Sequence, residues 1–188
     1  MDIKNVNSPE VLANIMVQVS LRNQAAFESL YQATSAKLFA LALRILNNKE
    51  QAEDVIQEVY VKVWYIADTY QPEKAAVMTW MTTIVRHRCI DLLRAKPKEQ
   101  QLYEDESFDD WAADDLGPMQ LAAAQSETKA LMQCMQQLAP LQRQAFALSY
   151  FKGLAHEDLA SRLAQPLGTV KTWLRRGLET LKNCMEGL

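Results

Sequence analysis

The sequence predicts an all-α protein made of two small helical domains that are joined by an acidic flexible linker. Five glycines and six prolines among 188 residues are too few for the many turns of a β-rich fold. Long stretches rich in Ala, Leu, Gln and Glu favour helices. Charge also divides the chain, because residues 99–126 carry eight Asp or Glu and no Lys or Arg, whereas both flanking blocks carry a small positive net charge.

Four helices are expected in the first domain, residues 1–96. Ser8-Pro9-Glu10 is a helix start followed by apolar residues at helical spacing. Further helices are expected from about Gln24 to Leu46, Glu50 to Ile66 and Val77 to Ala95, with Asn47-Asn48 as a turn. The buried face of the longest helix should consist of Phe27, Leu30, Tyr31, Leu38, Leu41, Ala42 and Ile45.

Residues 97–118 are the expected linker, because their acidic clusters and scattered apolar residues cannot bury enough surface to become ordered. It is either a solvated tether or an acidic segment that occupies a basic channel on a partner. The second domain, residues 119–188, begins with helices near Met119. Pro140 starts a further helix that ends at Lys152-Gly153.

The segment from His156 to Trp173 has the pattern of a helix-turn-helix. Leu159 and Leu163 are four residues apart and therefore face the same side of the first helix. Ala160 is small where two helices would cross, and Gln165-Pro166 and Gly168 let the chain turn. The second helix should begin at or shortly after Pro166.

The second helix of this motif has one apolar face and one mostly basic face. Val170, Leu174, Leu178 and Leu181 share the apolar face, and Trp173 is expected to pack beside them. An ordinary amphipathic surface helix would give the same face, but its combination with the turn favours a helix that enters a DNA major groove. The opposite side carries Lys171, Thr172, Arg175, Arg176 and Glu179.

Composition also bears on location. No apolar run reaches the roughly 18 residues that a membrane helix needs, and residues 1–20 lack the pattern of a signal peptide. Cys89, Cys134 and Cys184 are odd in number and widely spaced, which predicts buried thiols in a reducing compartment rather than a disulfide framework. These observations together predict a cytoplasmic protein.

Two helices of the first domain carry clustered charge. Asp54, Gln57 and Glu58 form a polar, acidic cluster at helical spacing, outside a stripe of apolar residues. Between Arg86 and Lys98 there are five cations and one carboxylate. One helix therefore presents an acidic surface and the other a basic surface.

These segments, in this order, resemble the bacterial sigma factors of the extracytoplasmic-function class, the smallest of the sigma-70 type. Residues 52–64 resemble the second region of a sigma factor, and residues 80–94, with the run Ile84-Val85-Arg86-His87-Arg88, resemble its promoter-melting helix. Residues 166–178 resemble its fourth region. The resemblance covers nearly the whole chain outside the linker. It departs from the family at His87, where Asn is common, at Ala164, where Gly is frequent, and at Trp173, where a polar residue is common.

The resemblance implies a protein that binds core RNA polymerase and directs it to promoter DNA, restrained by an anti-sigma factor, with no cofactor, no metal and no insertion into the membrane. The residues implied for the duplex −35 element are Thr169, Lys171, Thr172, Arg175 and Arg176. Those implied for the single-stranded −10 element are Trp80, Arg86, His87, Arg88, Asp91 and Arg94. Those implied for polymerase binding are Glu53, Asp54, Gln57 and Glu58.

Other functions remain open from the residues alone. A helix-turn-helix regulator that acts without polymerase would explain the C-terminal motif but not the two N-terminal helices. A carboxylate cluster at Glu50, Glu53, Asp54 and Glu58, or a metal pair at His87 and Cys89, would suggest an enzyme. Carboxylates at helical spacing usually form a solvated face, and the histidines and cysteines lack zinc-site spacing. A decoy for an anti-sigma protein would not need the basic faces.

Overall fold

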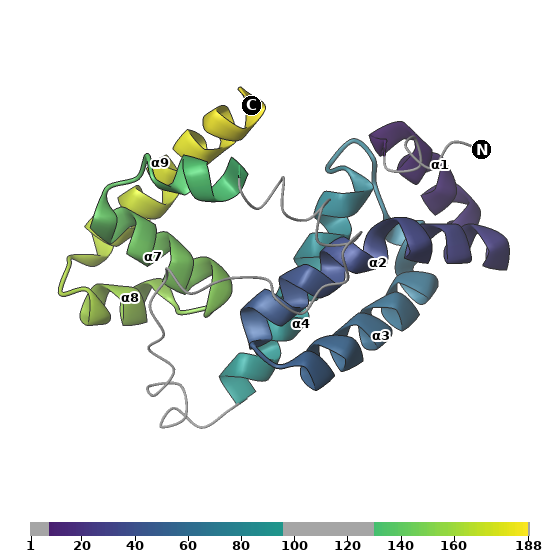
Figure 1. Ribbon diagram of the computed structural model, residues 1–188, viewed down its shortest axis with the longest axis horizontal. Coiled ribbons are helices and arrows are strands. Elements are labelled where there is room, and N and C mark those ends of the chain that lie inside the picture. The colour runs from purple at the N-terminus through teal and green to yellow at the C-terminus, as the bar shows by residue number, and fades with distance from the viewer. Residues whose placement is uncertain (1–7, 96–129, 188) are drawn as a thin grey trace. The chain divides into compact units, whose positions relative to one another are not determined.

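The computed structural model describes residues 8–95 and 130–187, and all regular elements in these ranges are helices (Figure 1). The chain divides into two compact units at residues 113/114. The all-α prediction is confirmed. The expected linker at 97–118, both expected domain boundaries and the helix start near Met119 lie outside the described residues.

The N-terminal unit contains four α-helices, and every helix bound predicted from the sequence agrees with the structure to within one residue; the end of the first helix was not predicted. Three of them begin at side-chain caps: Ser8, Asn23 and Asn48 accept hydrogen bonds from backbone N–H groups three residues ahead. A short 3₁₀ helix, η2 (Ala67–Thr69), extends the third helix. The helices are α1 (Pro9–Ser20), α2 (Gln24–Leu46), α3 (Lys49–Ile66) and α4 (Val77–Ala95).

Helix α2 is the centre of this unit and packs against α1, α3 and α4 (Figure 1). The core between them contains Leu30 and Leu38 from α2, with Val59 from α3 and Val85 from α4 among the fully or nearly fully buried side chains. The expectation that Tyr31 is buried was wrong, because its side chain is 47% exposed. It lies at the edge of the apolar face, where one side of its ring contacts Tyr60 and the rest stays in solvent.

A buried polar pair fastens α2 to α3. The Thr34 hydroxyl donates to the Leu30 carbonyl at 2.7 Å and lies 2.6 Å from the Tyr60 hydroxyl. Since the single Thr34 hydrogen is used within α2, the Tyr60 hydroxyl is the donor of the second bond. Burial raises the pKa of Tyr60, so the phenol keeps the proton that this bond requires.

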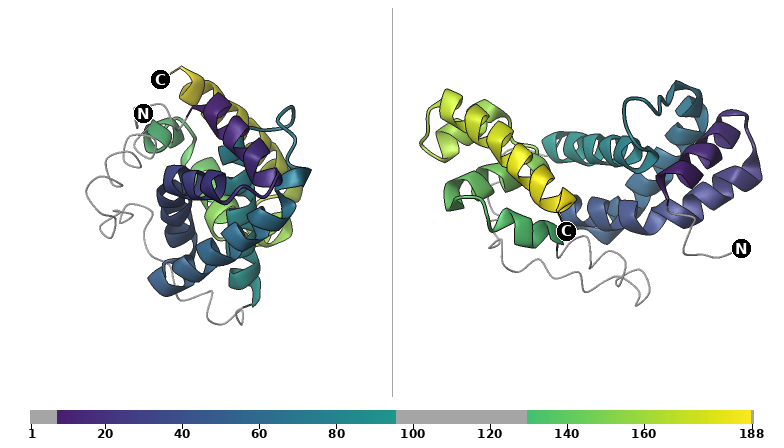
Figure 2. Two further views of the ribbon diagram at one scale, coloured as in Figure 1. Left: turned by 90° about the vertical axis from the view of Figure 1, so that its right-hand side faces the viewer. Right: turned by 90° about the horizontal axis from the view of Figure 1, so that it is seen from above.

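The C-terminal unit consists of a helical segment over 130–135 followed by α7 (Pro140–Phe151), α8 (His156–Arg162) and α9 (Leu167–Glu186). Helix α9 packs against both α7 and α8 (Figure 1 and Figure 2). Leu159 of α8 and Val170 of α9 are fully buried, so the helix-turn-helix predicted from their spacing is present.

The turn between α8 and α9 depends on a residue with a left-handed backbone, Ala164, whose φ is 50°. The chain leaves α8 through two hydrogen bonds, from the Gln165 N–H to the Ala160 carbonyl and from the Ala164 N–H to the Ser161 carbonyl. This is the Schellman arrangement, in which glycine normally occupies the left-handed position. Ala164 therefore adopts a strained, left-handed backbone at the position where the resemblance leads us to expect glycine.

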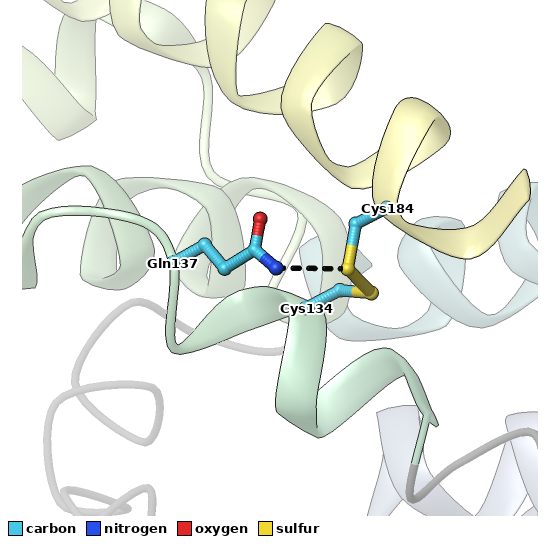
Figure 3. Close-up of a disulfide and its surroundings, with 3 residues drawn as sticks. All are labelled: Cys134, Gln137 and Cys184. Carbon is cyan, nitrogen blue, oxygen red and sulfur yellow. Dashed lines mark hydrogen bonds between the residues drawn. A yellow bond between two sulfur atoms is a disulfide. The ribbon is translucent and has the colours of Figure 1, made fainter. Parts of the chain in front are cut away.

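A disulfide joins Cys134 to Cys184, across 50 residues of sequence (Figure 3). It connects the helical segment over 130–135 to the last turns of α9, and the Gln137 amide donates to the Cys184 sulfur at 3.2 Å. The expectation of three buried thiols was therefore wrong, because close approach in the fold, not spacing in sequence, decides which cysteines pair. Cys89 is a free, buried thiol, and burial raises its pKa to about 12.

Candidate functional site

The first candidate surface is the basic face of α9. Lys171, Arg175 and Arg176 are exposed, and Thr169 and Thr172 are half-buried. The opposite side of the helix holds the buried residues Val170, Gly177 and Leu181. The structure thus places all five residues expected at the −35 element away from the core of the unit, as the helical period of 3.6 residues requires.

Two of these residues interact with groups one turn away on α9. The Thr172 hydroxyl donates to the Gly168 carbonyl at 2.8 Å, so its oxygen is left to act as an acceptor. Arg175 lies 3.5 Å from the Glu179 carboxylate in an exposed pair one turn apart. Such exposed pairs are weak, so the guanidinium of Arg175 stays available to other anionic groups.

Two apolar residues of α9 test the expected packing. Trp173 is half-buried, in keeping with a packing role. Leu178 was expected in the core but is 59% exposed. The buried line runs through Val170, Gly177 and Leu181, and Leu178 lies roughly 80° around the helix from Val170 at about 100° per residue. The edge of the apolar stripe thus faces solvent.

The second candidate surface is the face of α4 opposite its core. The core side holds the buried residues Val77, Met81, Val85, Cys89, Ile90 and Leu93. At about 100° per residue, His87, Asp91 and Arg94 lie on the far side, with Arg86 and Arg88 on its two flanks. His87, Asp91 and Arg94 are exposed, and the two flanking arginines are half-buried.

Trp80 differs from the other residues expected at the −10 element, because it packs against the loop that precedes α4. Its ring centroid is 5.5 Å from that of Tyr70. The Tyr70 hydroxyl donates to the Ala75 carbonyl at 2.9 Å and so closes the loop on itself. Tyr70 was not predicted as a site residue, although an aromatic residue in the loop before α4 was an available signal.

The third candidate surface is the acidic face of α3. Glu53, Asp54, Gln57 and Glu58 are all exposed. Asp54, Gln57 and Glu58 share one stripe along the helix, and Glu53 lies one turn before Gln57, about 40° around the helix from it. The structure therefore places all four residues expected to bind polymerase on one exposed side of α3.

Glu58 and Arg88 were expected on different surfaces, yet they are paired with each other. The Arg88 Nε lies 2.5 Å from one Glu58 oxygen and Nη2 lies 3.2 Å from the other, a two-pronged contact between α3 and α4. The hydrogen bond from Arg88 lowers the pKa of Glu58, and the bond to Glu58 raises the pKa of Arg88. The acidic and basic surfaces therefore meet at this ion pair.

Comparison with known proteins gives a family match for each of the two units. Residues 18–99 match the family model for sigma-70 region 2, and residues 128–181 match that for sigma-70 region 4. An ECF RNA polymerase sigma factor, SigK, of Mycobacterium sp. strain KMS is 30% identical over 177 residues, covering 91% of this chain and 89% of the relative. The chain belongs to the ECF RNA polymerase sigma factors.

Other relatives of this sigma factor align over similar lengths. SigK of Mycobacterium tuberculosis strain H37Rv is 29% identical over 174 residues, covering 92% of each chain. Among solved structures, Rhodobacter sphaeroides SigE in complex with the anti-sigma ChrR is 29% identical, with a TM-score of 0.48 and coverage of 94% of this chain and 98% of SigE.

Metal clusters and membrane-spanning helices are both absent from the described residues. No group of three or more His, Cys, Asp or Glu within 8–95 and 130–187 is placed to hold a metal ion. Among the helices of the same ranges, none is both long enough and apolar enough to cross a membrane.

Proposed function

We propose that this sigma factor selects promoters through the three surfaces described above, each with a separate task. The observation that carries the proposal is the exposed basic face of α9 within a helix-turn-helix, in a chain whose other unit matches sigma-70 region 2. The first unit supplies polymerase binding and −10 recognition, and the second supplies −35 recognition.

Helix α9 would enter the major groove of the duplex −35 element. Arg175 and Arg176 can contact guanine edges or phosphates, and Lys171 near the start of the helix can contact phosphate. Thr169 and Thr172 can contact the backbone or base edges from the same side of the helix. The buried side of α9, fixed by Val170, holds these side chains in one orientation.

Helix α4 and the loop before it would hold the −10 element as a single strand. Arg86 and Arg94 supply positive charge for the DNA backbone, and the loop offers a place for a base that has left the stack. His87 and Asp91 are exposed on the same helix and can read base edges by hydrogen bonds. Trp80 is held by Tyr70 and would support this loop or stack on a base.

The acidic stripe of α3 would bind core RNA polymerase by charge complementarity. Asp54 and Gln57 have exposed polar ends for this contact, and Glu58 would share its carboxylate with Arg88. Polymerase would then hold both DNA-reading units on one promoter, so weak separate contacts would combine into specific binding. We further propose an anti-sigma factor as the restraining partner and the cytoplasm as the location, as expected for this class.

In vitro transcription with core polymerase on a genomic library tests this function directly. Arg176→Ala should reduce initiation that depends on the −35 element while leaving polymerase binding intact. Lys182→Ala is the matched control, because Lys182 is an exposed cation near the other end of α9, paired with Glu186 at 3.8 Å. Equal loss of polymerase binding and initiation in the Arg176 variant would refute its assigned role.

A regulator that acts without polymerase is the competing function. It would use α9 in the same way but would leave α3 and the match to region 2 without a purpose. This competing function would be supported if the purified protein alone protected promoter DNA in a footprinting assay. The salt concentration should be one at which the proposed sigma factor needs polymerase to bind that DNA.

A further inference from the structure

The acidic stripe of α3 continues beyond Glu58 as an apolar one. Val61 is 59% exposed and Tyr65 is 66% exposed. At about 100° per residue both lie within roughly 20° of the line through Asp54, between the positions of Gln57 and Glu58. One continuous face of α3 is therefore acidic in its first half and apolar in its second half.

Neither side chain is needed for the core of the unit. The inner side of α3 is already filled by Val55, Val59 and Val63, which are buried against the other helices. Val61 and Tyr65 stay exposed on the line of the proposed docking face. Their composition is that of an interface centre, where aromatic residues are enriched and charges are depleted. We propose that Val61 and Tyr65 are the apolar anchor by which α3 binds core RNA polymerase.

The backbone beneath Tyr65 is held in place before any partner arrives. The Arg22 guanidinium, at the end of α1, donates to the carbonyls of Trp64 and Tyr65. The same guanidinium carbon lies 5.8 Å from the centroid of the Trp64 ring. An anchor on a fixed helix end loses little conformational entropy on binding, which favours affinity.

The charge distribution selects the partner surface. Glu58 is neutralised in part by Arg88 at 2.5 Å, so the acidic half of the face carries less net charge than its sequence suggests. The apolar half must then supply much of the binding free energy of the complex. The proposal predicts that the matching surface on polymerase carries cations opposite Asp54 and an apolar pocket opposite Tyr65. This inference rests on the proposed function, and it assigns the two halves of one face different tasks.

The two tasks differ in their kinetics. Exposed charges mainly set the association rate and its salt dependence, whereas buried apolar anchors mainly set the dissociation rate. Val61→Ser and Tyr65→Ala should raise the dissociation rate from core polymerase, Tyr65→Ala by about tenfold or more if it is a central anchor. Asp54→Asn should lower the association rate and reduce its dependence on salt.

The experiment uses full-length protein and immobilised core RNA polymerase, with association and dissociation rates measured at several salt concentrations. Val17→Ser is the matched control, because Val17 is 56% exposed on α1 and lies on a different helix from the proposed anchor. It should leave both rates unchanged. Circular dichroism of each variant verifies the fold, which substitutions at such exposed positions should preserve.

The possible outcomes separate this inference from the function beneath it. Binding by the wild-type protein, with loss of affinity in the Val61 and Tyr65 variants only through dissociation, supports the anchor. Wild-type binding with unchanged dissociation in both variants overturns the anchor and leaves the proposed function intact. No binding of the wild-type protein to core polymerase overturns both. If Val17→Ser has an effect equal to that of Val61→Ser, the apolar half of α3 has no special role.

Discussion

Removal of the disulfide should destabilise the C-terminal unit and leave the N-terminal unit unchanged. The bond closes a loop between Cys134 and Cys184, which are 50 residues apart. In the chain-entropy description of cross-links, a loop of this length contributes about 4 kcal/mol at 25 °C, through restriction of the unfolded chain. A small unit without a large core would lose much of its stability.

The assay compares the oxidised protein, the protein with a phosphine reductant, and a Cys134→Ala/Cys184→Ala double variant. Amide hydrogen exchange of the full chain at increasing urea gives the opening free energy of each unit separately. Labelling after denaturation verifies the state of the cysteines, because Cys89 alone reacts in the oxidised protein and three thiols react in the reduced one.

We expect protection in α7, α8 and α9 to fall on reduction by an amount near the entropic value, while that in α2 and α3 stays constant. The double variant should match the reduced protein and not respond to reductant. Reduction without a change of protection in α9 would refute the argument that the cross-link stabilises this unit. An equal change in both units would show that the units are not energetically separate.

Three further predictions concern single positions. Ala164→Gly should stabilise the C-terminal unit by roughly 0.5–1 kcal/mol in urea unfolding, because it relieves a left-handed alanine. Ala145→Gly, in a buried helical position, should instead destabilise the unit by about 1 kcal/mol. Stabilisation by neither variant, or by both, would contradict this prediction. A double-mutant cycle with Glu58→Gln and Arg88→Gln should give a coupling energy below about 1 kcal/mol, because both side chains are largely exposed, at 53% and 40%. A much larger coupling would show that solvent screens this pair less than its exposure suggests. The pKa of Cys89 is raised from 9.0 to about 12, so its contribution to stability should be complete below pH 9 and decline as the pH rises towards 12. Cys89→Ala should remove this part of the alkaline loss of stability, measured by urea unfolding. An unchanged slope of the unfolding free energy against pH would refute the assignment.

The helices were readable from sequence because their signals are local. Ser8 and Pro9 mark one helix start, and the Asn47-Asn48 turn separates the two helices of the expected core. The spacing of Leu159 and Leu163, with a turn after them, was likewise enough to place the helix-turn-helix. Bounds within one residue of expectation follow because capping and apolar period agreed at each of these ends.

The features missed from sequence depend on contacts between distant residues. The Cys134–Cys184 bond requires the approach of two segments 50 residues apart, and spacing gives no information about that distance. Glu58 and Arg88 were assigned to separate surfaces because their pairing across α3 and α4 depends on the angle between helices. Tyr31 and Leu178 lie at the margins of their apolar faces, where a small rotation of the helix decides between core and solvent.

Helix α1 gives a practical reason to look beyond the boundary of the family match. The match to sigma-70 region 2 begins at residue 18, yet Leu12 and Met16 of α1 are almost completely buried in the same core. Arg22, just after α1, bonds to the carbonyl groups that end α3. A fragment that begins where the match begins would expose the apolar surface that α1 covers and would therefore tend to aggregate. Expression of the region 2 unit should start before Ser8.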